Sequence, residues 1–330
     1  MKKILVFLLI LLLAACAPKT SFDGKDRPSV NGQLQVVNGR LADKNGKEVV
    51  LRGISSNGLS VGERYINEDT FHDISHVMGA NVFRLALYTW GVGSVGYCSG
   101  GDRNRLYQDV LKGVDAAEKS DMYAIVDWHI LDDGDPNKYL EDAKDFFSRI
   151  SKDLKDKDNV LYEICNEPNH CDWNTIKSYA DVIIPIIREH DPDSLIIVGT
   201  PNWSQDVDIA AGDPLGYDNL LYTLHFYSAT HKEDLRNKLK TALSKGLPVF
   251  VTEFGITSSS GGYPIDKEEA DVWIDLLEEN KISWCMWNFS KAAEPCAALK
   301  GDCLKTKDFL TEDFSEAGLW LIDTIKDKTN

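Results

Sequence analysis

The sequence predicts an α/β protein built as a single (β/α)8 barrel with a short β-hairpin before it. First, short apolar runs rich in β-branched residues alternate with longer amphipathic stretches from about residue 49 onward. Second, the alternation contains eight units within about 280 residues, which is the size of one α/β barrel domain. Third, polar side chains collect at the carboxyl ends of the runs, where barrels build their sites.

The apolar runs are expected to form parallel strands. Runs such as Leu195-Ile196-Ile197-Val198 are apolar at every position, which is typical of strands covered on both faces. The eight expected strands are residues 49–55, 81–87, 123–129, 160–167, 195–200, 220–227, 248–255 and 282–288.

The amphipathic stretches between them are expected to form helices. Pro136 at a first-turn position and Asp266 before Lys-Glu-Glu are typical helix starts. The hairpin is expected over residues 33–48, turning at residues 43–46. An open doubly wound sheet is the rival fold, but residues 53–58 do not match its G-x-G-x-x-G loop. The clearest expected helices are residues 104–119, 136–155, 173–190, 232–245 and 266–280.

The first residues have the layout of a secretory signal. Two lysines precede an apolar run over residues 4–13, and Leu-Ala-Ala-Cys follows, ending at Cys16. This resembles a bacterial lipoprotein signal, which implies removal of residues 1–15 and lipidation of Cys16. Residues 16–31 would then be a flexible tether, and residues 32–330 the catalytic domain. Ala17 resembles the outer-membrane sorting pattern of Gram-negative bacteria, so we expect a lipid anchor in the cell envelope. The alternative is an ordinary secreted protein.

Charge and composition narrow the possible partners. The formal net charge is −16, so no basic surface is available for nucleic acid. A neutral polysaccharide is compatible with this charge. We expect a monomer that contacts the membrane only through its N-terminal lipid.

The cysteines give no metal site with zinc-ribbon spacing, and we expect no metal and no cofactor. Without Cys16, six cysteines remain, which allow fifteen complete pairings. Cys296 with Cys303 is the most local candidate for a disulfide. Cys165 and Cys285 lie inside strand-like runs and are candidates for buried thiols.

Polar residues at the carboxyl ends of the expected strands indicate the site. Charges inside such apolar runs are costly unless they are paired or used. Glu167 and Glu253 follow strands three positions apart in an eight-stranded ring and would face each other, as glycosidic cleavage requires. Sugars stack on aromatic rings, and four tryptophans at or just beyond strand ends could serve this purpose or merely pack: Trp90, Trp128, Trp203 and Trp287. The polar strand-end residues are Arg84, Asp127, His129, Asn166, Glu167, His225, Tyr227 and Glu253.

Five short motifs on successive strands together resemble glycoside hydrolase family 5, most closely its bacterial endo-β-1,4-glucanases. The resemblance covers residues of about 33–325 and implies hydrolysis of β-glucan by a retaining double displacement. Glu167 would then be the general acid/base and Glu253 the nucleophile. The motifs are Val82-Phe83-Arg84, Asp127-Trp128-His129, Asn166-Glu167-Pro168, His225-Phe226-Tyr227 and Thr252-Glu253-Phe254-Gly255.

The same resemblance implies roles for the neighbouring residues. Asn166 would hold the sugar 2-hydroxyl, Tyr227 would hydrogen-bond the nucleophile, and Arg84 would keep the nucleophile ionised. His225 would lie beside the acid/base. From their strand-end positions, Asp127 and Glu163 are expected to form supporting ion pairs or strand-end structure rather than to catalyse. The remaining expected substrate-binding residues are His129, Trp287, Trp203, Lys291 and Glu294.

One segment departs from the family pattern and leaves the preferred substrate open. Relatives usually carry Ser-Ser-His-Gly-Leu and a nearby Trp after the first strand, whereas this chain has Asn57 and Val61 there. Lys291 is also shifted by one position. The alternatives are another β-glycanase of the family, acting on mannan, xyloglucan or mixed-linkage glucan, and a non-catalytic carbohydrate-binding lipoprotein.

Overall fold

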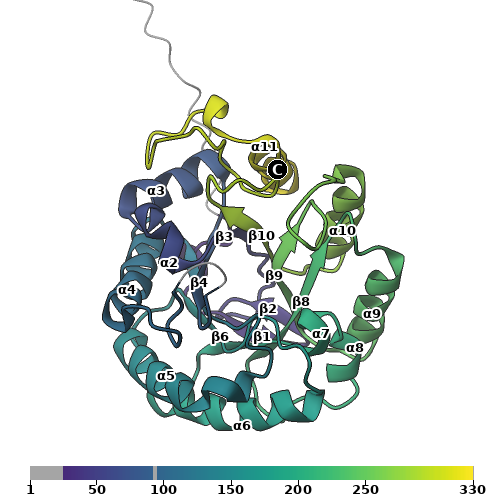
Figure 1. Ribbon diagram of the computed structural model, residues 1–330. Helices are drawn as coiled ribbons and strands as arrows, with labels where there is room; N and C mark the ends of the chain where they lie inside the picture. The colour runs from purple at the N-terminus through teal and green to yellow at the C-terminus, as the bar shows by residue number, and fades with distance from the viewer. Residues whose placement is uncertain (1–24, 92–94, 330) are drawn as a thin grey trace, which may run out of the picture.

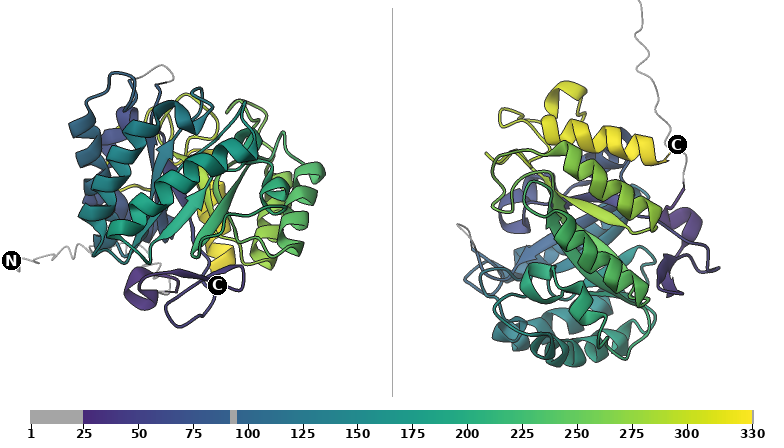
Figure 2. Two further views of the ribbon diagram at one scale, coloured as in Figure 1. Left: turned by 90° about the horizontal axis from the view of Figure 1, so that it is seen from below. Right: turned by 90° about the vertical axis from the view of Figure 1, so that its right-hand side faces the viewer.

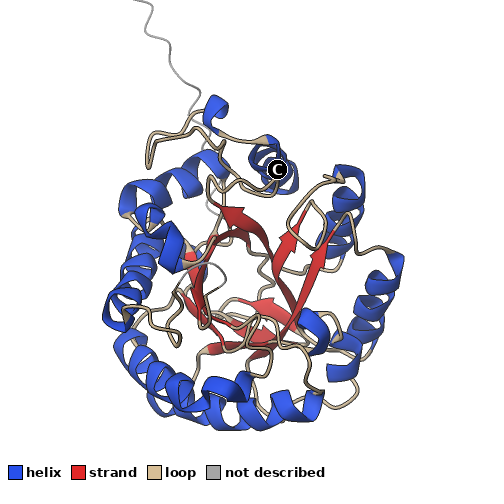
Figure 3. Cartoon of the chain, in the orientation of Figure 1, coloured by secondary structure: helices blue, strands red, loops and turns tan. Residues whose placement is uncertain are grey.

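The chain folds into a closed barrel of eight parallel strands surrounded by helices (Figures 1 and 3). This computed structural model describes residues 25–91 and 95–329. Around the barrel the strand order is β10-β3-β4-β5-β6-β7-β8-β9, as predicted for a (β/α)8 barrel. The strands are β3 (Arg52–Ser56), β4 (Val82–Tyr88), β5 (Tyr123–His129), β6 (Val160–Glu163), β7 (Leu195–Val198), β8 (Leu220–Tyr227), β9 (Val249–Gly255) and β10 (Trp284–Phe289).

The helices form the outer ring, and aspartates cap several of them. The side chains of Asp102, Asp172 and Asp266 accept hydrogen bonds from backbone N–H groups of the first turns of α4, α6 and α10. The long helices are α4 (Arg103–Lys119), α5 (Leu140–Leu154), α6 (Trp173–His190), α9 (Glu233–Ser244), α10 (Lys267–Glu279) and α11 (Glu316–Thr329). The short ones are α2 (Leu59–Gly62), α3 (Glu68–Asp73), α7 (Pro201–Ser204), α8 (Val207–Ala210) and the turns η1 (Glu63–Tyr65), η2 (Ile74–Met78), η3 (Pro136–Tyr139) and η4 (Thr311–Asp313).

The N-terminal segment makes the predicted turn and another turn before it. Strands β1 (Gln35–Val37) and β2 (Arg40–Ala42) pair antiparallel around Asn38-Gly39. Asn38 and Gly39 have φ angles of 51° and 76°, the left-handed conformation that a two-residue hairpin turn requires. The predicted turn at residues 43–46 also forms, because Ala42 bridges Glu48 antiparallel across it and the Gly46 N–H donates to the Asp43 carbonyl.

The folded domain begins earlier than predicted. The expected signal (residues 1–15), Cys16 and the tether up to residue 24 lie outside the described residues. The end of the expected tether is ordered, because Pro28–Asn31 forms helix α1. Arg27 is buried, and its Nη1 donates to Ser75 Oγ at 2.7 Å and to the Ala80 carbonyl at 2.9 Å. The composition of residues 25–31 did not indicate that Arg27 would bind Ser75 and Ala80.

The inside of the barrel is apolar at one end and polar at the other. The hairpin covers the apolar end (Figure 2). There, Leu34 and Leu41 pack with strand residues such as Ile125, Leu161 and Phe250. Two residues further along β5, Asp127 replaces the apolar side chain on the same strand face. The site must therefore lie at the end of the barrel opposite the hairpin.

Strands β3 and β4 approach each other closely at Gly53. A Cβ atom there would lie 1.9 Å from the Val82 carbonyl oxygen, a backbone atom that cannot move aside. We expect Gly53→Ala to destabilise the fold by about 3 kcal/mol or more, measured by urea unfolding. Gly301→Ala is the control, because nothing lies within 4 Å of a Cβ there. Equal unfolding midpoints for the two variants would contradict this account.

The six described cysteines are free thiols. The candidate pair Cys296–Cys303 is not formed: Cys296 Sγ lies 3.9 Å from the Gly261 carbonyl, and Cys303 Sγ lies 4.0 Å from Asp313 Oδ1. Cys165 and Cys285 are buried, as predicted. In the part of the chain that the structure describes, no helix has both the length and the hydrophobicity needed to cross a bilayer.

Candidate active site

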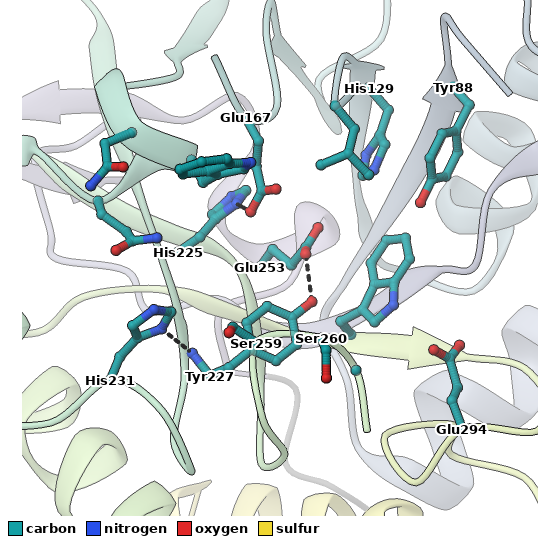
Figure 4. Close-up of a pocket in the computed structure, with 16 residues that line it drawn as sticks. Tyr88, His129, Glu167, His225, Tyr227, His231, Glu253, Ser259, Ser260 and Glu294 are labelled. Atoms are coloured by element: carbon teal, nitrogen blue, oxygen red, sulfur yellow. Dashed lines mark hydrogen bonds and ion pairs between the residues drawn. The ribbon is translucent and has the colours of Figure 1, made fainter. Parts of the chain in front are cut away.

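Glu167 and Glu253 face each other in a pocket at the carboxyl ends of the strands (Figure 4). The pocket has a volume of about 470 Å³. One carboxylate oxygen of Glu167 and one of Glu253 lie within 4.8 Å of each other. Retaining glycosidases hold their two carboxyl groups about 5–5.5 Å apart, whereas inverting enzymes need a wider gap for a water molecule. The two side chains are thus close enough to act on one sugar carbon.

Arg84 on β4 is the centre of the charge network below the pocket. It is fully buried. Its Nε donates to Glu163 at 2.7 Å, Nη1 donates to Glu253 at 2.9 Å, and Nη2 lies 3.0 Å from Asp127 Oδ2. Asp127 and Glu163 therefore form the supporting ion pairs that the sequence predicted. The three carboxylates compensate the charge of the buried Arg84 guanidinium, which in turn orients Glu253.

Both oxygens of Glu253 have fixed partners. Oε2 accepts from Arg84, and Oε1 accepts from the Tyr227 hydroxyl at 2.7 Å. Two donors on two different strands leave the carboxylate little freedom to rotate. The arrangement therefore fixes the orientation of a carboxylate that can act as a nucleophile.

Glu167 has a different setting. Burial, together with the nearby Asp127 and Glu163 carboxylates and against the opposing effect of Arg84, raises the pKa of Glu167 to about 8. Its Oε1 lies 2.9 Å from Nδ1 of His225. A carboxyl group with this pKa is protonated at neutral pH and can serve as a general acid.

His225 connects the acid to the buried network. Its Nε2 lies 2.9 Å from the Thr252 hydroxyl, which donates to Glu163 at 2.6 Å. Burial lowers the pKa of His225 to about 4, so the ring is neutral at neutral pH. A neutral ring places no second positive charge beside Glu167.

Asn166 has a single amide orientation, and this fixes the proton on His129. Its Oδ1 accepts from Arg84 Nη2 at 2.6 Å, so its Nδ2 is the donor towards His129 Nε2 at 3.3 Å. His129 must then carry its proton on Nδ1, which lies 2.7 Å from Asp127 Oδ2. Burial lowers the pKa of His129 to about 3, in agreement with a neutral ring.

Two of the four candidate tryptophans line the pocket, namely Trp287 and Trp203. Trp203 lies in a turn in which Asn202, Trp203 and Ser204 all have left-handed φ angles, of 58°, 56° and 55°. The turn is attached to the acid/base segment, because the Trp203 N–H donates to the Pro168 carbonyl at 3.0 Å and Ser204 Oγ donates to the Asn166 carbonyl at 2.7 Å. These bonds hold the ring at the pocket despite the unfavourable backbone.

The other two tryptophans do not line the pocket. Trp128 is buried on the outer face of β5 against Tyr97 and Phe146, so it is a packing residue. Trp90 is 41% exposed, with the Lys138 ammonium 4.7 Å from its ring centre.

Of the two candidates after β10, Glu294 lines the pocket and Lys291 does not. Several further lining residues were not predicted. Tyr88 is the last residue of β4, so its position at a strand end could have identified it as a lining residue. The loop residues could not be found in this way, because they follow no strand periodicity. The additional lining residues are Tyr88, Leu131, Asn202, Gln205, His231, Ser259, Ser260 and Gly261.

Glu167, His225 and Glu253 also form a set of potential metal ligands, each offering one atom within 4.8 Å of the others. Both nitrogens of His225 and both oxygens of Glu253 already have protein partners. The three side chains are therefore already engaged in hydrogen bonds within the protein.

In this barrel a protonated carboxyl group, Glu167, faces a firmly held one, Glu253, beside aromatic rings. This combination is typical of a glycoside hydrolase. The family model described as cellulase (glycosyl hydrolase family 5) matches residues 42–293. The chain belongs to glycosyl hydrolase family 5.

Named relatives agree with this family. Endoglucanase A of Butyrivibrio fibrisolvens is 43% identical over 298 residues, which are 89% of this chain and 68% of that protein. An endoglucanase of Clostridium saccharobutylicum is 43% identical over 299 residues, 90% of this chain and 66% of that protein. The chain thus spans about two thirds of these relatives. The catalytic domain of Thermobifida fusca endoglucanase Cel5A superposes with a TM-score of 0.86 at 36% identity, covering 91% of this chain and 99% of that one.

The setting of Glu167 predicts an alkaline limit to activity. Because the acid must be protonated and burial raises the pKa of Glu167 to about 8, kcat/KM should fall as the pH rises above that value. The fall should approach about tenfold per pH unit. The measurement is kcat/KM on a neutral soluble β-glucan between pH 5 and 10. A decline that begins near pH 5 would contradict the assignment.

Proposed function

We propose that this chain is a retaining endo-β-1,4-glucanase that hydrolyses internal linkages of cellulose or related β-glucans. The observation that carries the proposal is the opposition of Glu167, with its raised pKa, to Glu253, held by Arg84 and Tyr227. Family membership supports it, as do the endoglucanase names of relatives at 43% identity. A structure of the Thermobifida fusca domain in complex with cellotetraose gives further support.

The proposed reaction has two displacements. Glu253 attacks the anomeric carbon while Glu167 donates its proton to the departing glycosidic oxygen, which gives a covalent glycosyl–enzyme and a shortened chain. Glu167, now ionised, removes a proton from water, and the resulting hydroxide equivalent attacks the same carbon and releases Glu253. Two inversions give net retention of configuration.

The surrounding residues have proposed substrate roles. Asn166 is held by Arg84 and by the Ile130 carbonyl, and its second amide hydrogen would exchange the 3.3 Å contact with His129 Nε2 for a bond to the sugar 2-hydroxyl, which strengthens as charge develops. Trp287 would provide the floor of the cleavage subsite together with His129, whose ring stacks at 5.4 Å from it. Trp203 would stack with a sugar on the leaving-group side.

We propose that the protein is anchored to the cell envelope through a lipid on Cys16. The support is the Leu-Ala-Ala-Cys sequence after an apolar run, with Ala17 favouring the outer membrane. Cys16→Ser should move the protein from the membrane fraction to the soluble fraction. An unchanged distribution would contradict the anchor without affecting the catalytic proposal.

Reducing-sugar release from uncharged substrates tests the activity. Amorphous cellulose, mixed-linkage β-glucan, xyloglucan and mannan are compared, and the anomeric configuration of the first product is followed by NMR. We expect cleavage of cellulose or mixed-linkage glucan with a β-configured product. Preference for mannan or xyloglucan would favour another β-glycanase of the family. Binding without cleavage would favour the carbohydrate-binding alternative.

A further inference from the structure

Two consecutive residues of β9, Thr252 and Glu253, both contact polar groups inside the barrel. Consecutive side chains of a strand normally point to opposite faces of the sheet. Here the register of β9 shifts against β8, between Thr223 and His225, and also against β10. Such an irregularity redirects side chains next to active sites. Glu253 can therefore bond to Arg84 while the Thr252 hydroxyl bonds to groups deeper in the barrel.

The Thr252 hydroxyl uses its hydrogen on Glu163. Its Oγ1 donates to Glu163 Oε1 at 2.6 Å, and the other oxygen of Glu163 accepts from Arg84 Nε at 2.7 Å. Two further groups contact the same Oγ1, namely the Thr223 hydroxyl and His225 Nε2. A hydroxyl donates one hydrogen and can accept two. Towards Thr223 and His225, the oxygen of Thr252 must therefore be the acceptor.

The direction of this bond fixes the hydrogen on the ring of His225. Nε2 lies 2.9 Å from Thr252 Oγ1, and because that oxygen accepts, Nε2 must carry the hydrogen. The ring is neutral, since burial lowers the pKa of His225 to about 4. A neutral imidazole with its hydrogen on Nε2 has an unprotonated Nδ1, which can only accept. This tautomer is the opposite of that of His129, which carries its hydrogen on Nδ1.

The unprotonated nitrogen of His225 faces Glu167. Oε1 of Glu167 lies 2.9 Å from Nδ1 (Figure 4). Two acceptors cannot bond to each other, so Glu167 must supply the hydrogen as a carboxylic acid. A hydrogen bond that exists only for the neutral form disfavours ionisation, and it holds the free enzyme in the state that the first displacement needs. Once the proton has been donated, the carboxylate faces the same nitrogen without a bond, which favours removal of a proton from water.

We propose that Thr252 is a positioning residue whose hydroxyl keeps the ring hydrogen of His225 on Nε2 and so leaves Nδ1 to accept the acidic hydrogen of Glu167. The inference rests on the proposed function, which gives the Glu167 proton its use. Both tautomers of His225 are neutral, so the effect is one of hydrogen-bond direction and not of added charge. The charged and titratable groups that face this pair from β4, β5, β6 and β9 are Arg84, Asp127, His129, Glu163 and Glu253.

Thr252→Val removes the hydroxyl and keeps the β-branched shape of the side chain. Nε2 of His225 then faces Glu163 Oε1 at 3.9 Å, which is beyond hydrogen-bond distance. The ring hydrogen should therefore move to Nδ1, from which His225 donates to the Glu167 carboxylate. Thr252→Ser retains the hydroxyl and should behave as the wild type. Thr223→Val is the matched control, because it removes an equally buried hydroxyl that contacts Thr252 rather than His225.

The position of the ring hydrogen is measured by NMR of the protein labelled with ¹⁵N-histidine, with His225 assigned from a His225→Asn variant. This spectrum needs no substrate, so it decides the inference even if the proposed activity fails. We expect the hydrogen on Nε2 in the wild type, Thr252→Ser and Thr223→Val, and on Nδ1 in Thr252→Val. Hydrogen on Nδ1 in the wild type would overturn the inference. That result would arise if Glu163, whose pKa is raised by burial, donated a proton to Thr252. An unchanged tautomer in Thr252→Val would also overturn it.

The pH dependence of activity gives the second readout. In Thr252→Val the alkaline fall of kcat/KM on a neutral β-glucan should begin about one pH unit lower or more, because Glu167 gains a donor that favours its carboxylate. The loss relative to wild type should be about tenfold near pH 9 and small near pH 5, where Glu167 is protonated in both enzymes. Thr252→Ser and Thr223→Val should keep the wild-type profile. A loss of equal size at every pH, or one that Thr252→Ser shares, would mean that Thr252 only supports the fold and would overturn the inference.

Discussion

Replacement of Glu253 by alanine is expected to reduce kcat on a neutral β-glucan by about five orders of magnitude, because a covalent step is lost and not merely a contact. Both oxygens of this carboxylate are held, by Arg84 at 2.9 Å and by Tyr227 at 2.7 Å, so the side chain that is lost is one in a fixed orientation. The measurement is initial-rate hydrolysis at high enzyme concentration.

The loss must be separated from unfolding, since Glu253→Ala leaves the buried Arg84 with one fewer partner. Glu253→Gln retains the size of the side chain and one acceptor oxygen, so its fold should survive. Urea unfolding and substrate binding by both variants provide the check. Tyr227→Phe is a graded control that removes one donor to Glu253 and should reduce kcat by about tenfold to a hundredfold. A wild type no faster than Glu253→Ala would instead identify the protein as a carbohydrate-binding module.

The strand-end residues could be predicted from the sequence because their position is physically unusual. Arg84 and Glu253 are charges inside otherwise apolar runs, and such charges are retained only where partners compensate them. Parallel strands of a barrel all end at one rim, so these residues had to converge. Neither step requires knowledge of a side-chain rotamer.

Other features depend on information that a linear pattern does not contain. Trp128 and Trp287 both lie near strand ends, but Trp128 is on the outer strand face and packs against Phe146, whereas Trp287 lines the pocket. Which of the two tryptophans faces the pocket is clear only once the register of the strands is known. The contact between Asn57 and Glu294 joins residues 237 positions apart in the sequence. No local signal could have paired these two side chains.

The hairpin turn could have been found from sequence chemistry. Asn-Gly is a strong signal for a two-residue turn, and it occurs at Asn38-Gly39 as well as at residues 45–46. Both turns form: Val36 pairs with Leu41 around the first, and Ala42 bridges Glu48 around the second. The Asn-Gly signal was therefore correct at residues 45–46, and the same signal could have identified the additional turn at Asn38-Gly39.

Replacement of Glu167 by alanine should make the rate depend on the leaving group, which distinguishes a general acid from a residue that only binds. On β-glucan, whose leaving alcohol must be protonated, kcat should fall by about three orders of magnitude or more. An aryl cellobioside with an acidic phenol needs no such proton, so its bond should still break quickly. The phenol should then appear as a burst, because the glycosyl–enzyme lacks the base that activates water.

Azide tests the second role of Glu167. It is a nucleophile that needs no deprotonation, and removal of the glutamate side chain leaves room for it beside the trapped sugar. Azide should accelerate turnover of Glu167→Ala but not of Glu253→Ala, and the product should be the β-glycosyl azide. The fall of kcat/KM at alkaline pH, which we attribute to the raised pKa of Glu167 of about 8, should also disappear for the aryl substrate. If β-glucan and the aryl cellobioside lose activity equally and azide restores neither, Glu167 is not the acid/base, and the proton donor must lie elsewhere in the pocket.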